Sequence, residues 1–160
     1  MDQPLPAAAR RVADAAVVLG LDIRVLEMPA STRTAEEAAA ACGCRVGQIV
    51  KSLVFAGKTS GTPYLLLVSG DNRVNEKAMA KVLGEPLTRP DADFVRETTG
   101  FAIGGVAPIG HANALRTLFD EDLLKFDVIW AAAGTPRCVF ETRPQALARA
   151  TGAEVVCVTA

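Results

Sequence analysis

The stretch IVKSLVFAGKTSGTPYLLLVS, residues 49–69, decides the fold because two strand-like segments lie on either side of a short loop. Residues 49–56 are apolar on both faces at period two, which is typical of a central strand covered on both sides. The loop has turn composition and residues 64–69 form a second strand, so we predict an antiparallel hairpin. A doubly wound fold would need a crossover helix at this point, and the hairpin argues against it.

Helix and strand signals are mixed on both sides of this hairpin. Capping residues such as Thr34, Asn75 and Thr142, apolar periodicity and terminal glycines predict short helices at residues 6–19, 34–43, 75–84, 91–99 and 142–152. Further strand-like runs occupy residues 22–28, 115–119, 128–133, 138–142 and 154–159. We therefore predict one domain over residues 1–160 of the mixed α/β (α+β) class, with a curved, barrel-like mixed sheet flanked by short helices.

Composition and charge narrow the class of protein. Half of the 160 residues are apolar, which is enough to build a core without disulfides or metals. A formal net charge of −1 argues against a broad basic surface for long DNA, but leaves a short or terminal nucleic-acid contact open. The N-terminus MDQPLPAAARR lacks the pattern of a signal peptide and no run reaches 18 apolar residues, so we expect a cytoplasmic protein without a membrane partner.

The cysteines and the single histidine do not have the spacing of a metal site. Cys42 and Cys44 form a C-x-C pattern without a second pair, and His111 stands alone. Cys138 and Cys157 lie in apolar strand-like segments, where a small buried hydrophobic role is expected. We therefore expect reduced thiols, no metal and no cofactor.

Residues 98–111, TTGFAIGGVAPIGH, are the first candidate for a binding site. We predict an apolar strand in which Gly104 and Gly105 mark a bulge, or a place where another backbone or a ligand comes very close. Pro108 then fixes the direction in which the chain leaves. Backbone N–H groups turned out of the ladder here could bind a phosphate, a ribose or an acyl oxygen. The alternative is an ordinary bulge at a barrel corner.

Lys51 is the second candidate, because it is a charged residue inside an otherwise apolar strand. Such a lysine needs a partner, water or a ligand, and it could anchor a phosphate or carboxylate. The alternative is a lysine whose head reaches water near the strand end. Ser52 follows it directly, so the two side chains point to opposite faces and cannot form a serine–lysine catalytic pair.

Four segments together resemble the YbaK-like aminoacyl-tRNA deacylases: IVKSLVF, YLLLVSGDNRVN, GFAIGGVAPIGH and FDVIWAAAGTPRCVFETRP. That family is related to the editing domain inserted in bacterial prolyl-tRNA synthetases. The resemblance covers nearly the whole chain in order. It implies a mixed α/β, barrel-like domain that hydrolyses a wrongly attached amino acid from the 3′ end of a tRNA.

The resemblance also implies roles for individual residues. Lys51 corresponds to a strand lysine that contacts the nucleotide end of the substrate. Gly104 and Pro108 correspond to the first and last positions of a G-x-x-x-P loop, whose backbone N–H groups, including that of Gly105, would position the ester carbonyl and stabilise its oxyanion. The remaining pocket wall would be formed by Phe101, Val106, Ala107 and Ala132.

The far wall of the implied pocket departs from part of the family. Gly134 corresponds to a glycine there, whereas Thr135 stands where some relatives carry a histidine. His111 could act as a general base because of its ordinary pKa, or it could cap or pack the turn after Pro108.

The expected activity is therefore hydrolysis in trans of misacylated tRNA, most simply tRNA(Pro) carrying cysteine, alanine or another small amino acid. An aminoacyl ester is already activated, so positioning of its carbonyl against N–H donors can suffice. The alternatives are a non-catalytic module that binds aminoacyl-adenylates or tRNA ends, and a partner of a synthetase such as prolyl-tRNA synthetase.

Overall fold

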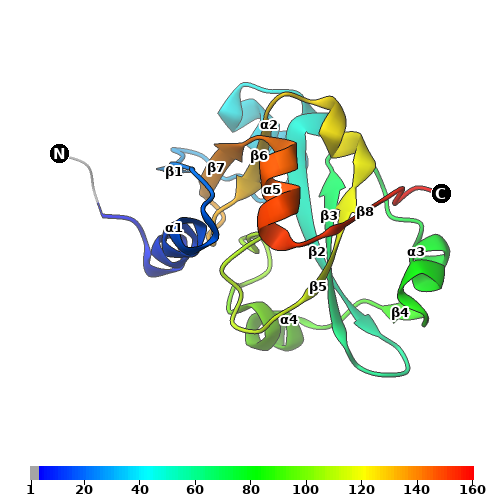
Figure 1. Cartoon of the computed structure of the whole chain (residues 1–160). Coiled ribbons are helices and arrows are strands. Elements are labelled where there is room, and N and C mark those ends of the chain that lie inside the picture. Colours follow the sequence, from blue (N-terminus) through cyan, green and yellow to red (C-terminus); the bar gives the residue numbers. More distant parts are fainter. Residues whose placement is uncertain (1–3) are drawn as a thin grey trace.

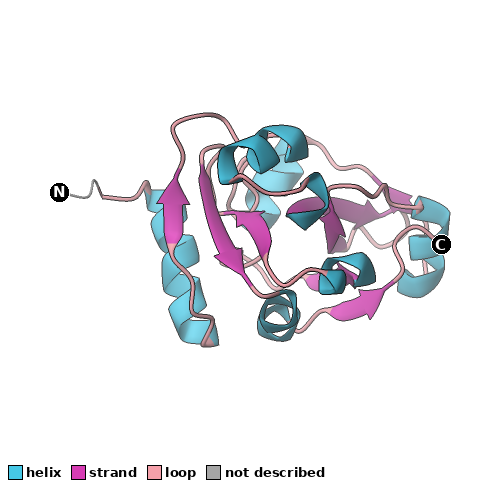
Figure 2. Cartoon of the chain, turned by 90° about the horizontal axis from the view of Figure 1, so that it is seen from above, coloured by secondary structure: helices cyan, strands magenta, loops and turns pink. Residues whose placement is uncertain are grey.

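The computed structural model describes residues 4–160, which form one mixed sheet with helices around it. Figure 1 shows α5 in front of the sheet and α1 and α3 at opposite sides of the molecule, and Figure 2 shows from above that helices lie on more than one side of the strands. The α-helices are α1 (Ala7–Leu19), α2 (Ala35–Cys42), α3 (Glu76–Leu83), α4 (Ala92–Thr99) and α5 (Pro144–Thr151), and the 3-10 helices are η1 (Val46–Gln48) and η2 (Glu121–Lys125).

The strands follow the order β1-β7-β6-β2-β3-β5-β8, and β4 pairs separately with β2. Their bounds are β1 (Val25–Glu27), β2 (Ile49–Gly57), β3 (Pro63–Ser69), β4 (Leu87–Thr88), β5 (Arg116–Asp120), β6 (Ile129–Ala132), β7 (Cys138–Thr142) and β8 (Glu154–Val156). The predicted α/β class with a mixed sheet is confirmed. The sheet stays open instead of closing into a barrel, because β1 and β8 are its two ends and do not pair with each other in the described residues.

The hairpin at the centre of the sheet is also confirmed. β2 and β3 pair antiparallel from Val50↔Ser69 to Ala56↔Pro63. On its other side β2 pairs parallel with β6, at Ile49↔Trp130 and Val50↔Ala131, while β3 pairs parallel with β5. A hairpin flanked by parallel partners gives a mixed sheet, and it places β2 and β3 in the middle of the molecule.

Local capping signals set most of the helix starts. The Thr34 hydroxyl accepts a hydrogen bond from the Glu37 N–H at 3.1 Å, and the Asn75 side chain accepts one from the Ala78 N–H at 3.1 Å, as predicted. The prediction for the last helix was wrong by one residue. Thr142 ends β7, Arg143 is the N-cap without a side-chain bond, and Pro144 is the first helical residue.

The predicted strand within residues 98–111 is not a strand. Thr98 and Thr99 end α4, and residues 100–115 form a loop without helix or strand, which we call the glycine loop. Gly100, Gly104 and Gly110 have φ angles of +80°, +95° and +82°, which are incompatible with a continuous strand. Phe101, Val106, Ala107 and Ile109 of the loop are instead buried within the main core cluster, whereas Ile103 is exposed.

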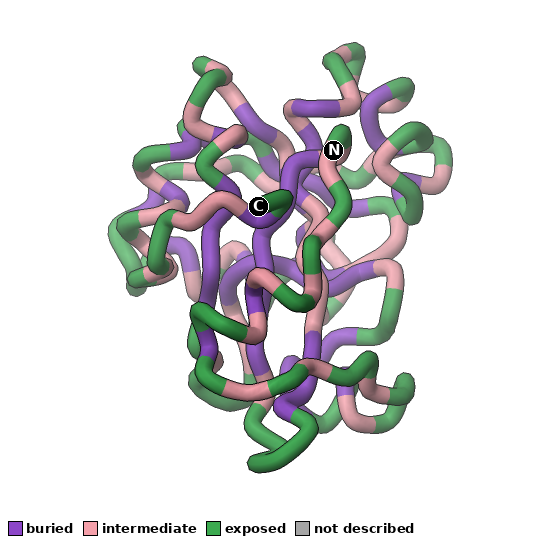
Figure 3. Tube along the Cα trace, turned by 90° about the vertical axis from the view of Figure 1, so that its right-hand side faces the viewer, coloured by how far each residue is buried: buried purple, intermediate pink, exposed green. Residues whose placement is uncertain are grey.

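Both faces of the central hairpin are covered, as the sequence predicted. One core cluster joins β2 and β3 residues such as Leu65 and Leu67 to α1, α5 and the glycine loop. The other packs Phe55, Leu66 and Val68 against α3 residues, including Met79. Buried segments run through the interior of the molecule, whereas exposed segments gather at its periphery (Figure 3). Within residues 4–160, none of the helices has the length and apolar character that crossing a membrane requires.

Candidate active site

A cavity of about 930 Å³ lies beside the middle of β2. Its floor is formed by β2, and its walls come from residues 32–38, from the glycine loop, from the end of β6 and from the segment around Pro90 that precedes α4. This volume is in the range of small-molecule sites in proteins. Four predicted site residues line it: Lys51, Gly104, Val106 and Ala132.

The charged side chains around this cavity all have the same sign. Arg33, Lys51, Arg73 and Arg89 line it, and no carboxylate among the described residues does so. The chain as a whole has a net charge of −1, so the positive lining of the cavity differs in sign from the protein as a whole. Cations that gather around a concave site attract anionic ligands such as phosphates. Arg33 and Arg89 were not predicted from the sequence.

Lys51 is half-buried and has a partner inside the protein. Its Nζ donates a hydrogen bond to the backbone carbonyl of Asn72, in the loop that follows β3. Burial lowers the pKa of Lys51, the nearby Glu36 carboxylate opposes this, and Arg73 lowers the pKa further. The lysine also borders a second cavity of about 540 Å³, lined by residues 70–73. It therefore lies where the two cavities meet.

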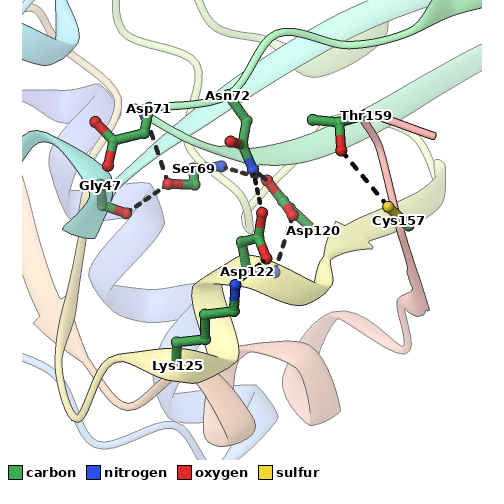
Figure 4. A network of polar contacts seen from close by, with 9 residues as sticks. All are labelled: Gly47, Ser69, Asp71, Asn72, Asp120, Asp122, Lys125, Cys157 and Thr159. Carbon is green, nitrogen blue, oxygen red and sulfur yellow. Dashed lines mark hydrogen bonds and ion pairs between the residues drawn. The ribbon is translucent and has the colours of Figure 1, made fainter.

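The carbonyl that holds Lys51 belongs to a loop fixed by a polar network (Figure 4). Asp120 is 1% exposed, and its carboxylate accepts hydrogen bonds from the Ser69 N–H at 3.0 Å and from the Asn72 amide at 2.8 Å. The same Asn72 amide donates to Asp122 at 2.7 Å. Sequence reasoning missed this network, although an aspartate at the end of an apolar strand was a signal for it. The network connects η2 to the position of Lys51.

The glycine loop reaches the cavity at Gly104. A Cβ atom there would lie 3.1 Å from the Arg33 Nε, and the φ of +95° already disfavours any side chain. The Gly105 N–H, which was predicted to stabilise the oxyanion, already donates a hydrogen bond to the Ala102 carbonyl within the loop, at 3.0 Å. The N–H groups of Gly104 and Val106 have no acceptor among the described residues.

Behind the cavity, three backbone segments are stacked closely. A Cβ atom on Gly105 would lie 2.9 Å from the carbonyl atoms of Gly134 and from the Thr135 Cα. A Cβ atom on Gly134 would lie 2.7 Å from the Ala8 carbonyl oxygen of α1. The sequence predicted a close approach of a backbone or a ligand at the glycine pair, and at Gly105 the neighbour is a backbone.

Thr135 serves the turn between β6 and β7. Its hydroxyl oxygen accepts hydrogen bonds from the N–H groups of Arg137 and Cys138, at 3.2 and 3.1 Å. Neither Thr135 nor Gly134 lines the cavity. The two residues instead hold the surface against which the glycine loop packs.

His111 packs against the inside of the glycine loop. Its Nε2 lies 2.6 Å from the Ala107 carbonyl oxygen, and its ring meets Phe101 edge-on with centroids 6.1 Å apart. The Arg11 guanidinium covers the Phe101 ring at 4.3 Å. Burial lowers the pKa of His111 and Arg11 lowers it further, while the bond to Ala107 opposes this. This arrangement supports the packing alternative.

The predicted site residues thus fall into two layers. Lys51, Gly104, Val106 and Ala132 border the cavity. The other predicted residues lie behind that surface and shape the loop: Phe101, Gly105, Ala107, Pro108, His111, Gly134 and Thr135. Within residues 4–160, no three histidine, cysteine or acidic side chains lie close enough together to hold a metal ion.

Comparison with known proteins decides the family. Residues 29–150 match the model of the aminoacyl-tRNA editing domain, and this range includes every residue that lines the cavity. The chain belongs to this family. The matched range leaves out the two end strands β1 and β8, but it contains the central strands, the polar network at Asp120 and the glycine loop.

Relatives of this editing domain include free-standing proteins and parts of synthetases. YwhH of Bacillus subtilis, which is uncharacterised, is 32% identical over 77% of this chain and 78% of its own length. EbsC of Enterococcus faecalis, proposed to deacylate Cys-tRNA(Pro) and Cys-tRNA(Cys), is 29% identical over 79% of this chain and 77% of its own length. A proline–tRNA ligase of Limosilactobacillus fermentum is 34% identical over 56% of this chain but only 16% of the ligase.

A solved structure extends the likeness to nearly the whole chain. The crystal structure of a proposed trans-editing enzyme for prolyl-tRNA synthetase superimposes with a TM-score of 0.92 at 49% identity. The match covers 98% of this chain and 99% of the other. The family is therefore one of tRNA-editing domains and deacylases related to the editing domain of prolyl-tRNA synthetase.

Proposed function

We propose that this protein hydrolyses misacylated tRNA in trans, in the cytoplasm, and that its substrate is tRNA(Pro) carrying cysteine, alanine or another small amino acid. The observation that carries this proposal is the ring of cations, Arg33, Lys51, Arg73 and Arg89, around a cavity that contains no carboxylate among the described residues. The 3′ end of a tRNA is a short polyanion with a terminal adenosine and an aminoacyl ester. Such a ligand needs local positive charge and no broad basic surface.

The chemistry proposed for this site is positional. Water attacks the ester carbonyl carbon, the bond to the ribose oxygen breaks, and that oxygen takes a proton, which releases the amino acid and a tRNA with a free terminal hydroxyl. The oxyanion formed on the way needs N–H donors, and the Gly104 and Val106 amides have no other acceptor among the described residues. Gly105 then supports the loop instead of donating to the substrate.

Lys51 has the role of an anchor in this proposal. Its ammonium group lies at the cavity wall and is held by the Asn72 carbonyl, so it presents a fixed positive charge to the nucleotide end of the substrate. Loss of this charge should affect both the binding of the tRNA end and the position of the ester.

The test is a deacylation assay with tRNA(Pro) charged separately with cysteine, alanine, serine and proline. We expect selective loss of a noncognate ester with the wild-type protein, and loss of that activity in Lys51→Met, which keeps the length of the side chain. Folding of the variant is checked by its unfolding midpoint. If no ester is cleaved on tRNA(Pro) or on other tRNAs, while the tRNA end still binds, the protein is a binding module and the proposal fails.

A further inference from the structure

The middle of β2 is exposed in an unusual way for a central strand. The four consecutive residues from Lys51 to Val54 are half-buried, whereas the residues on both sides of them are buried. Successive side chains of a strand point to opposite faces, so exposure of one face would alternate along the strand. Continuous exposure over four residues indicates instead that the edge of the strand is open.

The pairing of the sheet shows where this open edge begins and ends. β6 pairs with β2 only as far as Val50↔Ala131, and β4 pairs with it only from Ala56↔Thr88 onwards. Between these points, no described strand is in register with β2 on that side. The cavity occupies this gap, since residues 51–55 all line it.

The ladder with β3 tells which backbone groups face the gap. The Gly70 N–H donates to the Ile49 carbonyl, and the Gly57 N–H donates to the Thr62 carbonyl, both at 2.8 Å. In an antiparallel ladder these bonds recur at every second residue, so the odd-numbered residues of β2 bond to β3. The N–H and C=O groups of Ser52 and Val54 therefore point into the cavity.

These groups have unused hydrogen-bonding capacity. No strand among the described residues pairs with Ser52 or Val54 on this edge. The Ser52 hydroxyl is also buried and has no hydrogen-bond partner among the described residues. An unmade hydrogen bond in a partly buried place is costly, so open donors and acceptors that border a cavity are suited to a ligand.

We propose that the open edge of β2 at Ser52 and Val54 binds the aminoacyl group of the substrate in the way a neighbouring strand would. This inference rests on the proposed function and names how its site recognises the amino acid. An extended aminoacyl ester presents an ammonium donor and a carbonyl acceptor, as a strand residue does. The ammonium donates a hydrogen bond to a β2 carbonyl. The carbonyl oxygen of the ester accepts one hydrogen bond from a β2 N–H and a second from an N–H of the glycine loop.

The geometry also defines a substrate class. Recognition through main-chain atoms tolerates different small side chains, but it favours an unsubstituted ammonium group on an extended residue, because a carbon on the nitrogen takes up space at the strand edge. A prolyl ester keeps two N–H donors on its secondary ammonium, but its ring puts a carbon where a primary ammonium has its third hydrogen and fixes rotation about the N–Cα bond. It therefore fits poorly on an open strand edge with walls on both sides. The edge therefore selects against prolyl esters and would spare correctly charged tRNA(Pro).

The gap is too short for an extended peptide segment. β6 closes one end of it at Val50, and β4 closes the other at Ala56. The glycine loop and residues 32–38 form walls over it. An aminoacyl group on a terminal nucleotide fits these limits better than a continuous strand.

The direct test follows backbone hydrogen exchange by NMR with a stable amide analogue of the substrate, 3′-(alanylamino)-3′-deoxyadenosine. We expect saturating analogue to slow exchange of the Ser52 and Val54 N–H groups about fivefold or more, the factor of one net hydrogen bond. The N–H groups of Leu53 and Phe55 already bond to β3 and serve as internal controls. The matching prolyl analogue should give no such protection.

Three outcomes of the exchange test overturn the inference: no binding of the alanyl analogue, binding without protection of Ser52 and Val54, or equal protection by the prolyl analogue.

A second test compares cleavage of alanyl and N-methylalanyl esters on the same tRNA, each divided by its uncatalysed rate. We expect the N-methyl ester to react at least about tenfold more slowly, because the methyl group replaces one N–H and crowds the strand edge while two N–H donors remain. Equal rates contradict the inference but leave the proposed function standing, whereas no cleavage of either ester counts against the proposed function alone.

Variants give an independent check on the protein side. Val54→Pro removes the N–H that faces the cavity without removing a bond to β3, whereas Val54→Ala keeps it. Both variants change the side chain at the cavity, so they are compared with each other: we expect Val54→Pro to bind the alanyl analogue at least about fivefold more weakly than Val54→Ala. Equal binding by the two folded variants overturns the inference. If that variant does not fold, the exchange test decides.

Discussion

Gly105 packs directly against the backbone of Gly134, so that a Cβ atom at Gly105 would lie 2.9 Å from the Gly134 carbonyl carbon and oxygen. This contact joins the glycine loop to the turn between β6 and β7, and the turn in turn packs on α1 through Ala8. The wall of the cavity at Gly104 is therefore supported by two layers of backbone. Space, and not conformation, is the constraint at Gly105, because its φ is not positive.

Gly105→Ala should destabilise the protein by about 1–3 kcal/mol, since a methyl group in a close-packed backbone contact forces a shift. It should also reduce deacylation, because the loop that presents the Gly104 and Val106 amides must move. Gly152→Ala is the matched control. Its φ is +63° with open space around it, so it should lose about 1 kcal/mol of stability without loss of activity. Chemical denaturation and single-turnover deacylation measure the two effects, and an active, fully stable Gly105→Ala protein would contradict the role of the contact.

Asn72→Ala removes the two hydrogen bonds to Asp120 and Asp122 and leaves the carbonyl that holds Lys51. We expect a loss of stability of about 1–3 kcal/mol, because Asp120 is left as a buried carboxylate with one acceptor site unused. Because the loop then no longer fixes Lys51, kcat should fall more than KM rises. A variant that loses stability but keeps kcat would show that the network is structural only.

The sequence predicted those features that depend on neighbouring residues. The caps at Thr34 and Asn75 depend on contacts three residues away, and the hairpin around residues 59–63 depends on a short loop, so both were visible in the chain. Lys51 was visible because a charge interrupts an apolar strand. Its location at the cavity follows from that conflict between residue type and environment.

The features that were missed depend on residues far apart in the chain. The glycine loop has the apolar composition of a strand because Phe101 and Ala107 are buried, but burial by packing and burial within a sheet leave the same signal in the sequence. The gap between β6 and β4 follows from where two ladders stop, and nothing local to residues 51–55 records it. Arg33 and Arg89 reach the cavity from separate segments, which only the tertiary structure brings together.

His111→Gln separates packing from catalysis at this position. Gln can still donate a hydrogen bond to the Ala107 carbonyl, so deacylation at pH 7.5 should stay within about threefold of the wild type if the ring only packs the loop. A general base should lose about a hundredfold or more. The assay of kcat for both proteins at this pH decides between the two alternatives that the sequence left open.

The same variant has a pH signature in stability. Burial lowers the pKa of His111 below its ordinary value of 6.5, so the unfolded chain takes up the proton first as the pH falls. Its contribution to stability is therefore complete above pH 6.5 and declines below it. We expect the stability advantage of the wild type over His111→Gln to shrink between pH 7.5 and pH 5.5 in urea unfolding. An advantage that grows over this range would contradict the buried, neutral state of the ring.

Arg89→Gln tests whether the cations around the cavity bind the tRNA end. Arg89 is largely exposed, and its one ion pair within residues 4–160 is with Glu76 at 3.4 Å, so its removal should change the fold little. If it contacts a phosphate, KM for misacylated tRNA should rise several-fold with kcat nearly unchanged, and the slope of log KM against log salt concentration should fall by about 0.7–1. Arg137→Gln is the control, because Arg137 is exposed but lies outside the cavity lining. Equal effects of the two variants on KM would mean that tRNA binding depends on the overall charge of the protein, and that the cations at the cavity do not form a phosphate site.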